Sequence, residues 1–104
     1  MTRESLLQVA KERVQVALGD RLRGVVFYGS GARGEAGPDS DLDLLVLLDG
    51  PVNLGPDLEQ IIAALYPLQL ESEQPIHAIP VDYALYTAGH YALHRRAQRE
   101  GILL

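Results

Sequence analysis

Cysteine is absent from this chain of 104 residues. Its absence excludes disulfide bonds and thiolate-bound metal sites, and it is typical of a protein that works in the reducing cytoplasm. A signal-peptide pattern is missing as well, because charged residues from Arg3 to Arg13 alternate with apolar ones near the start of the sequence. We therefore expect a cytoplasmic protein.

Long apolar runs and an excess of basic residues are also missing. Hydrophobic residues make up 47% of the chain, but no run approaches the roughly 20 residues that a membrane-spanning helix needs. The chain has 9 Lys and Arg against 14 Asp and Glu, and its net charge is -5. Proteins that bind nucleic acid by themselves normally carry a basic patch or stripe. We expect one domain over residues 1–104, with no membrane insertion and no direct nucleic-acid binding.

The most informative stretch runs from residue 25 to residue 46 and reads VVFYGSGARGEAGPDSDLDLLV. A short apolar run leads into Gly29 and Ser30, and Asp41 and Asp43 open a second apolar run. Alternate residues of a strand point to the same face, so the two carboxylates project together. Such a pair retains one proton unless a cation neutralises it. Mg²⁺ prefers carboxylate oxygens and commonly takes substrate phosphates as further ligands.

The loop in front of the two acids complements them. Gly29 lets the backbone approach a ligand closely. Ser30 supplies a hydroxyl and is expected to open a short helical turn, whose free N–H groups favour phosphate. Arg33 in this turn could donate to a phosphate, or it could be solvated or paired with Glu35. The loop can thus hold phosphates while the following strand holds a metal ion.

Other motifs fit this stretch less well. Residues 29–34 match the dinucleotide fingerprint G-x-G-x-x-G, but residues 35–40 are too few for the dozen or so that a parallel crossover needs. A Walker loop requires lysine where Glu35 stands. A calcium loop beginning at Asp39 would lack both its glycine and its bidentate glutamate. The remaining alternative is a glycine-rich turn followed by a solvated acidic turn.

The rest of the chain shows alternating helix and strand patterns. Apolar residues at three- and four-residue spacing indicate helices. We expect Pro67 to end the second helix and Thr87 to cap the last one. The short connection between the first two strands argues against a purely parallel sheet. The predicted helices cover residues 2–19, 54–66 and 88–101, the predicted strands cover residues 23–28, 41–48 and 76–86, and residues 102–104 form an apolar tail.

Two further positions call for an explanation. Asp82 lies within the third predicted strand, where an unpaired acid costs free energy. A metal ion shared with Asp41 and Asp43 would explain it, and an exposed acid at a strand edge is the alternative. His90 and His94 have the spacing of metal ligands on a helix, but they lack the glutamate of the H-E-x-x-H pattern, so we interpret them as surface histidines.

Gly29-Ser30, ten residues, and then Asp41-x-Asp43 resembles the signature of the nucleotidyltransferase superfamily that includes DNA polymerase beta. The string GSGARGEAGPDSDLDLLV is similar to that of the minimal nucleotidyltransferases, small proteins usually paired with a helical HEPN-domain partner in toxin–antitoxin modules. Gly31 departs from the pattern, because many relatives have a larger residue there. The resemblance covers nearly the whole chain. It implies an α/β (α+β) nucleotidyltransferase fold, with a small mixed sheet of three or slightly more strands and helices packed on one side.

The resemblance also implies an activity. The protein would move a nucleoside monophosphate, AMP from ATP, to a hydroxyl acceptor with the help of Mg²⁺ or Mn²⁺. One carboxylate, Asp82, would bind the metal on the acceptor side or act as a base. The implied residues are Asp41, Asp43 and Asp82 for metal binding and catalysis, and Gly29, Ser30 and Arg33 for the nucleotide.

The size of the chain and the resemblance together indicate what kind of acceptor to expect. The core and the nucleotide site use nearly all of the predicted elements, so the acceptor would be small or would be carried on a partner protein. The resemblance favours a tyrosine of a HEPN toxin, with this chain as the antitoxin. A binding antitoxin without catalysis and a free-standing transferase acting on a small molecule remain as alternatives, and self-association into a homo-oligomer is compatible with either.

Overall fold

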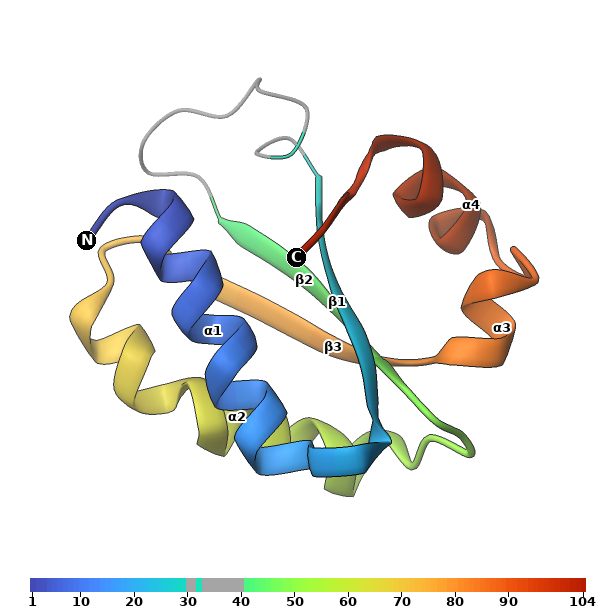
Figure 1. The fold of residues 1–104 in the computed structure, drawn as a ribbon, viewed down its shortest axis with the longest axis horizontal. Helices are drawn as coiled ribbons and strands as arrows, with labels where there is room; N and C mark the ends of the chain where they lie inside the picture. The colour runs from blue at the N-terminus through green and yellow to red at the C-terminus, as the bar shows by residue number, and fades with distance from the viewer. Residues whose placement is uncertain (30–31, 33–40) are drawn as a thin grey trace.

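The computed structural model describes residues 1–29, 32 and 41–104 (Figure 1). The turns predicted between Gly29 and Asp41 therefore lie outside the described residues, apart from Ala32. The elements are α1 (Arg3–Leu18), the 3-10 helix η1 (Gly19–Arg21), β1 (Leu22–Tyr28), β2 (Leu42–Leu48), α2 (Leu54–Glu71), β3 (Ile76–Asp82), α3 (Tyr83–Thr87), α4 (Ala92–Glu100) and β4 (Ile102–Leu103).

The four strands form one mixed sheet in the order β3-β2-β1-β4. Strand β1 is antiparallel to both β2 and β4, whereas β2 and β3 are parallel. The mixed sheet predicted from the short β1–β2 connection is thus confirmed. The predicted apolar tail supplies the edge strand β4, and the Leu104 N–H donates to the Val25 carbonyl at 2.9 Å.

The long helices α1 and α2 lie side by side against one face of the sheet (Figure 1). Alternate residues of β2 from Leu42 to Leu48 point into this layer, as the period of a strand requires. Leu45 and Leu47 point to the opposite face, where α3 contributes Tyr86 and α4 contributes Ala97. We expected helices packed on one side of the sheet, and α1 and α2 form that layer. The two short C-terminal helices, α3 and α4, form a second, smaller layer on the opposite face.

Helix α1 begins and ends close to the predicted residues. The Thr2 hydroxyl accepts a hydrogen bond from the Ser5 N–H at 3.1 Å and caps the first turn. Gly19 follows the helix with φ 57, a left-handed conformation that glycine adopts without strain. Both ends were therefore predictable from local chemistry.

The prediction that Pro67 ends the second helix is wrong, because α2 continues to Glu71. Proline removes one backbone hydrogen bond from a helix. Leu65 and Leu68 on either side of it are nevertheless buried in the core. Gln69 also bridges the last turn to β3, since its side chain accepts from the Ile76 N–H at 2.7 Å. These tertiary contacts hold the final turn in place.

The predicted boundaries between residues 76 and 101 also need correction. Strand β3 ends at Asp82 instead of Tyr86, because the Asp82 carboxylate accepts from the Leu85 N–H at 3.2 Å and caps α3. Thr87 ends α3 and does not cap the last helix. Gly89, with φ 64, separates α3 from α4, which begins only at Ala92.

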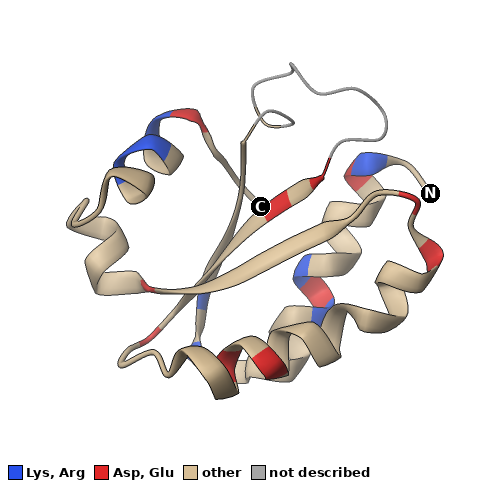
Figure 2. Cartoon of the chain, turned by 180° about the vertical axis from the view of Figure 1, so that it is seen from behind, with Lys and Arg blue, Asp and Glu red and all other residues tan. Residues whose placement is uncertain are grey.

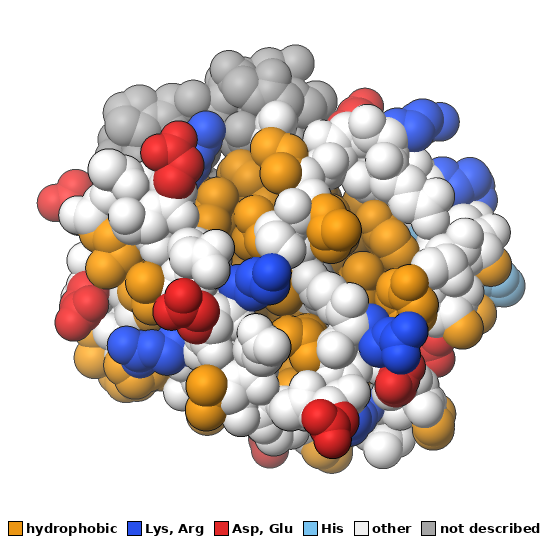
Figure 3. All heavy atoms as spheres, in the orientation of Figure 1, with side chains coloured by type: hydrophobic (Ala, Val, Ile, Leu, Met, Phe, Trp, Pro, Cys, Tyr) orange, Lys and Arg blue, Asp and Glu red, His pale blue; other side chains and the backbone are white. Residues whose placement is uncertain are grey.

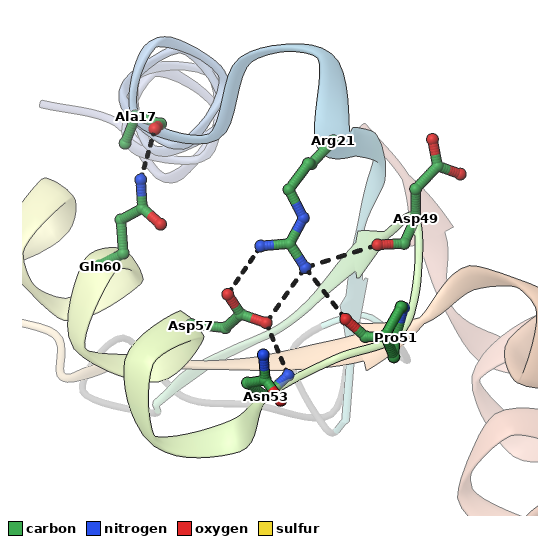
Figure 4. Close-up of polar contacts among 7 residues, drawn as sticks. All are labelled: Ala17, Arg21, Asp49, Pro51, Asn53, Asp57 and Gln60. Carbon is green, nitrogen blue, oxygen red and sulfur yellow. Dashed lines mark hydrogen bonds and ion pairs between the residues drawn. The ribbon is translucent and has the colours of Figure 1, made fainter.

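A partly buried ion pair ties η1 to the start of α2 (Figure 4). The Arg21 guanidinium donates to both carboxylate oxygens of Asp57, at 2.7 and 3.1 Å. The Asn53 N–H also donates to Asp57 at 2.9 Å, and Arg21 reaches the carbonyls of Asp49 and Pro51 at 3.4 Å. Because Asp57 is only 5% exposed, the hydrogen bonds from Arg21 and from the Asn53 N–H compensate for its lost hydration.

The face that carries α3 and α4 is less completely covered than the other. A hollow of about 250 Å³ lies between the sheet and these helices, and hydrophobic side chains gather in the middle of this view (Figure 3). Its walls include Val26, Leu47, Tyr86 and Leu103. None of the helices in the described part of the chain is long and apolar enough to cross a membrane.

Candidate active site

The pairing of β1 with β2 brings Gly29 against Asp43. The register places Tyr28 opposite Asp43, and Gly29 follows directly with φ 87. A Cβ atom at position 29 would lie 2.8 Å from Oδ2 of Asp43. Glycine is therefore needed here both for its backbone conformation and for the close approach of the carboxylate.

Asp41 and Asp43 lie at the start of β2, next to this glycine. Asp43 is partly buried and stands on the same face as Leu45 and Leu47, whereas half of the Asp41 side chain is exposed. Burial raises the pKa of the Asp43 carboxyl; the nearby His77 opposes this rise and the charge of Asp41 adds to it. The site thus holds a carboxylate whose ionised form is disfavoured by its surroundings.

Tyr28 also belongs to this site through its pairing with Asp43. Its side chain is partly buried, and burial raises the pKa of its hydroxyl, with the charge of Asp43 as a second cause. The phenol therefore stays protonated at neutral pH and can donate a hydrogen bond. The sequence analysis assigned it no role.

His77 is a site residue that the sequence analysis missed. The parallel register of β2 and β3 places it opposite Asp43, and its Nε2 atom lies 3.1 Å from Oδ2 of Asp41. The only signal in the sequence is a polar residue near the start of a predicted apolar strand. The pairing itself depends on the strand register, which an intervening helix of 18 residues leaves open.

Asp82 does not join the carboxylate pair, and the expectation that it shares a metal ion with Asp41 and Asp43 needs correction. In the β2–β3 register Asp82 stands opposite Leu48, whereas Asp43 stands opposite His77. Five residues of parallel strand separate the two levels by roughly 16 Å. Asp82 instead caps α3, and a Cβ atom at Gly50 would collide with its carboxylate.

The remaining candidates from the sequence have different outcomes. Ser30 and Arg33 lie outside the described residues. His90 lies before α4, and His94 is 6% exposed and packs against Tyr86 and Tyr91, so the interpretation of His94 as a surface residue is wrong. Within the described part of the chain, its Nδ1 atom has no hydrogen-bond partner.

A cationic residue of α4 lines a cavity that Gly29 also lines. A cavity of about 100 Å³ beside Tyr28 and Gly29 is also lined by Leu93, Arg96 and Glu100. Arg96 therefore belongs to the same cavity as Gly29, and guanidinium groups bind phosphate well. The sequence analysis gave this arginine no function, because only the docking of α4 on the sheet brings it to Gly29.

The donor groups of the site fit a hard divalent cation. Asp41 and Asp43 offer carboxylate oxygens, which Mg²⁺ and Mn²⁺ accept as ligands. Among residues 1–29, 32 and 41–104, no group of three or more His, Asp or Glu side chains is placed to hold a metal ion. An ion bound by the two carboxylates would complete its coordination with substrate phosphates and water, as Mg²⁺ usually does.

Comparison with known proteins identifies the family. Residues 4–103 match the nucleotidyltransferase domain, and the chain belongs to this family. A search of curated protein sequences finds no match.

Two solved structures share the fold. One is a crystal structure of a toxin–antitoxin with AMP-PNP, with a TM-score of 0.64 and 13% identity over 98% of this chain and 72% of that chain. The other is a Sulfolobus solfataricus protein described as a nucleotidyltransferase, with a TM-score of 0.58 and 21% identity over 96% of this chain and 79% of that chain. At these identities the similarity concerns the fold.

Proposed function

We propose that this chain is a metal-dependent nucleotidyltransferase of the cytoplasm that moves AMP from ATP to a hydroxyl group. We propose as its acceptor a tyrosine of a HEPN-type toxin, so that the chain acts as the antitoxin. The observation that carries the activity is the contact of Gly29 with Asp43 in a chain that belongs to the nucleotidyltransferase family. The similarity to a toxin–antitoxin structure with AMP-PNP supports the choice of nucleotide and partner.

The proposed reaction is a displacement at the α-phosphorus of ATP. The acceptor oxygen forms a bond to this phosphorus, the bond to the oxygen that bridges to the β-phosphate breaks, and pyrophosphate leaves. The hydroxyl proton passes to water or to a neighbouring base. A divalent ion held by Asp41 and Asp43 would neutralise the charge of the phosphates and align them.

The other side chains of the site would position these groups. Gly29 and Ser30 would bring backbone N–H groups and a hydroxyl to the triphosphate, with Arg33 as a further donor. Arg96 would add a positive charge from α4. His77 would orient the Asp41 carboxylate through their 3.1 Å contact.

A binding antitoxin without catalysis is the second candidate, and one observation favours it. Asp82 lies far along β3 from the carboxylate pair, so the described residues lack the third carboxylate that the resemblance implies. In this alternative the carboxylates would be dispensable, and contact alone would neutralise the toxin.

The double variant Asp41→Asn/Asp43→Asn separates the two candidates. Purified chain, HEPN-type partner, ATP and Mg²⁺ are incubated together, and intact-mass spectrometry detects AMP on the partner. We expect the variant to form the complex but to transfer no AMP and give no protection from the toxin. The matched control Glu12→Gln/Asp20→Asn removes the same charge from α1 and η1 and should transfer normally. Full protection by the first variant, without any modification by the original protein, would establish the binding alternative.

A further inference from the structure

Helix α2 carries hydrophobic side chains on a face that the fold leaves uncovered. Leu58, Ile62, Tyr66 and Leu70 follow one another at intervals of four residues, and we call them the α2 stripe. Ile62 is 55% exposed, Tyr66 58% and Leu70 70%. Residues four apart form a continuous ridge on a helix, and such ridges are the ones most often used when helices pack together.

The stripe borders a preformed groove. The groove has a volume of about 100 Å³ and lies between α2 and β3, which is an edge strand of the sheet. Gln69 holds its two sides together, because its side chain accepts from the Ile76 N–H at 2.7 Å and donates to the Gln74 carbonyl at 3.0 Å. The residues that line the groove are Ile61, Ile62, Leu65, Tyr66, Gln69, Ile76 and Ala78.

The segment of the chain that carries the stripe has formal charges of a single sign. From Leu54 to Asp82 the sequence contains no Lys or Arg. Figure 2 shows acidic segments near the start of α2 and in the turn after it. The exposed charged residues there are Glu59, Glu71 and Glu73. An apolar strip in acidic surroundings is complementary to an apolar face flanked by Lys or Arg.

We propose that the α2 stripe and its groove are the docking site for an amphipathic helix of a partner protein, with Lys and Arg on both sides of its apolar face. The stripe from Leu58 to Leu70 extends for about 18 Å, which three to four turns of a partner helix would cover. A second copy of this chain fits less well, because a two-fold contact would set the same acidic residues against each other. The inference rests on the proposed function for the existence of a partner, and it adds the surface that holds it.

Defined peptide probes test the proposal without the natural partner. One is an 18-residue fluorescent helix with Leu at positions i, i+3, i+4 and i+7 and Lys on the flanks; the other has Glu in place of Lys. Fluorescence anisotropy should show about tenfold tighter binding of the Lys peptide at low salt, and less difference at high salt. Backbone NMR shifts on titration should be largest at Ile62, Tyr66 and Ile76.

Two surface variants locate the site. Ile62→Ser/Tyr66→Ser removes apolar area that is already exposed, so we expect a folded protein that binds the Lys peptide about tenfold more weakly. Val16→Ser is the matched control, because Val16 is 86% exposed on α1 and lies outside the stripe. This control should bind the peptide as the original chain does.

The outcomes separate this inference from the proposed function. Equal binding of both peptides, or unchanged binding by the Ile62→Ser/Tyr66→Ser variant, would overturn the docking site. A dimer of the chain alone that this variant disrupts, observed by light scattering, would assign the stripe to a second copy and also overturn it. The Asp41→Asn/Asp43→Asn variant should bind the Lys peptide normally. Absence of AMP transfer by the original chain, with peptide binding intact, would count against the transferase and leave the docking site standing.

Discussion

Nε2 of His77 lies 3.1 Å from Oδ2 of Asp41, across the parallel pair of β3 and β2. The contact joins a residue that the sequence analysis overlooked to one that it placed at the centre of the site. It also shows that an imidazole lies beside Asp41 and Asp43, where the sequence analysis expected the carboxylate of Asp82. By position, His77 and not Asp82 is the residue of β3 that accompanies the carboxylate pair.

The first prediction concerns His77. Replacing it with aspartate puts a carboxylate beside Asp41 and Asp43, and Mg²⁺ prefers oxygen ligands to imidazole nitrogen. We expect His77→Asp to bind Mg²⁺ about tenfold more tightly, measured by isothermal titration calorimetry without nucleotide. His77→Asn, which is similar in size but uncharged, is the control and should show no such gain. Equal affinity in His77→Asp and the original chain would remove His77 from the metal site.

The second prediction concerns Asp82, which caps α3. Asp82→Ala should lower the free energy of unfolding by about 1 kcal/mol, and Asp82→Ser, which can still cap the helix, should lose less. Neither change should reduce the rise in melting temperature that Mg²⁺ and ATP cause by binding the folded state. If Asp82→Ser abolished that rise, Asp82 would be a ligand after all.

The third prediction concerns Gly29. Its φ of 87 and the 2.8 Å approach of Asp43 to a Cβ atom both oppose a side chain. Gly29→Ala should cost about 1–3 kcal/mol in urea unfolding and weaken ATP binding. Gly55→Ala is the matched control, because no atom lies within 4 Å of its Cβ position and it lies within α2. The control should be neutral or stabilising by up to about 1 kcal/mol.

The fourth prediction concerns Asp43 in metal-free buffer. Burial raises the pKa of its carboxyl, so its ionised form opposes folding and its contribution to stability is lost as pH rises through the folded-state pKa. Asp43→Asn should therefore raise the melting temperature slightly at pH 7 while losing the stabilisation by Mg²⁺ and ATP. A lower melting temperature without metal would show that the carboxylate has a structural role.

The fifth prediction concerns the pair of Arg21 and Asp57. Hydrogen bonding to Arg21 lowers the pKa of Asp57, so its contribution to stability is present above the ordinary carboxyl pKa of about 3.9 and is lost as pH falls through the lower folded-state value. Asp57→Asn should lower stability by about 1–3 kcal/mol at pH 7. The loss should be smaller near pH 3. Thermal unfolding across this pH range would measure both, and a pH-independent loss would contradict the ion pair.

The sequence by itself determined the features that depend on near neighbours in the chain. Local chemistry predicts that Thr2 caps α1 and that Gly19 ends it, and the structure agrees. It also predicts that successive side chains of β2 point to opposite faces and that the short connection after β1 gives a mixed sheet, as observed. The positions of Gly29 and Asp43 were also predictable, because a short antiparallel connection brings the end of one strand to the start of the next.

Only the tertiary structure decided the rest of the site. The register between β3 and β2 places His77, and not Asp82, beside the carboxylate pair. The sequence could not predict this register, because a helix and its connections leave the register of a parallel strand free until the strands pack. The docking of α4 brought Arg96 to Gly29. Helix α2 continues beyond Pro67 because Leu65 and Leu68 are buried, and their packing in the core outweighs the lost backbone hydrogen bond.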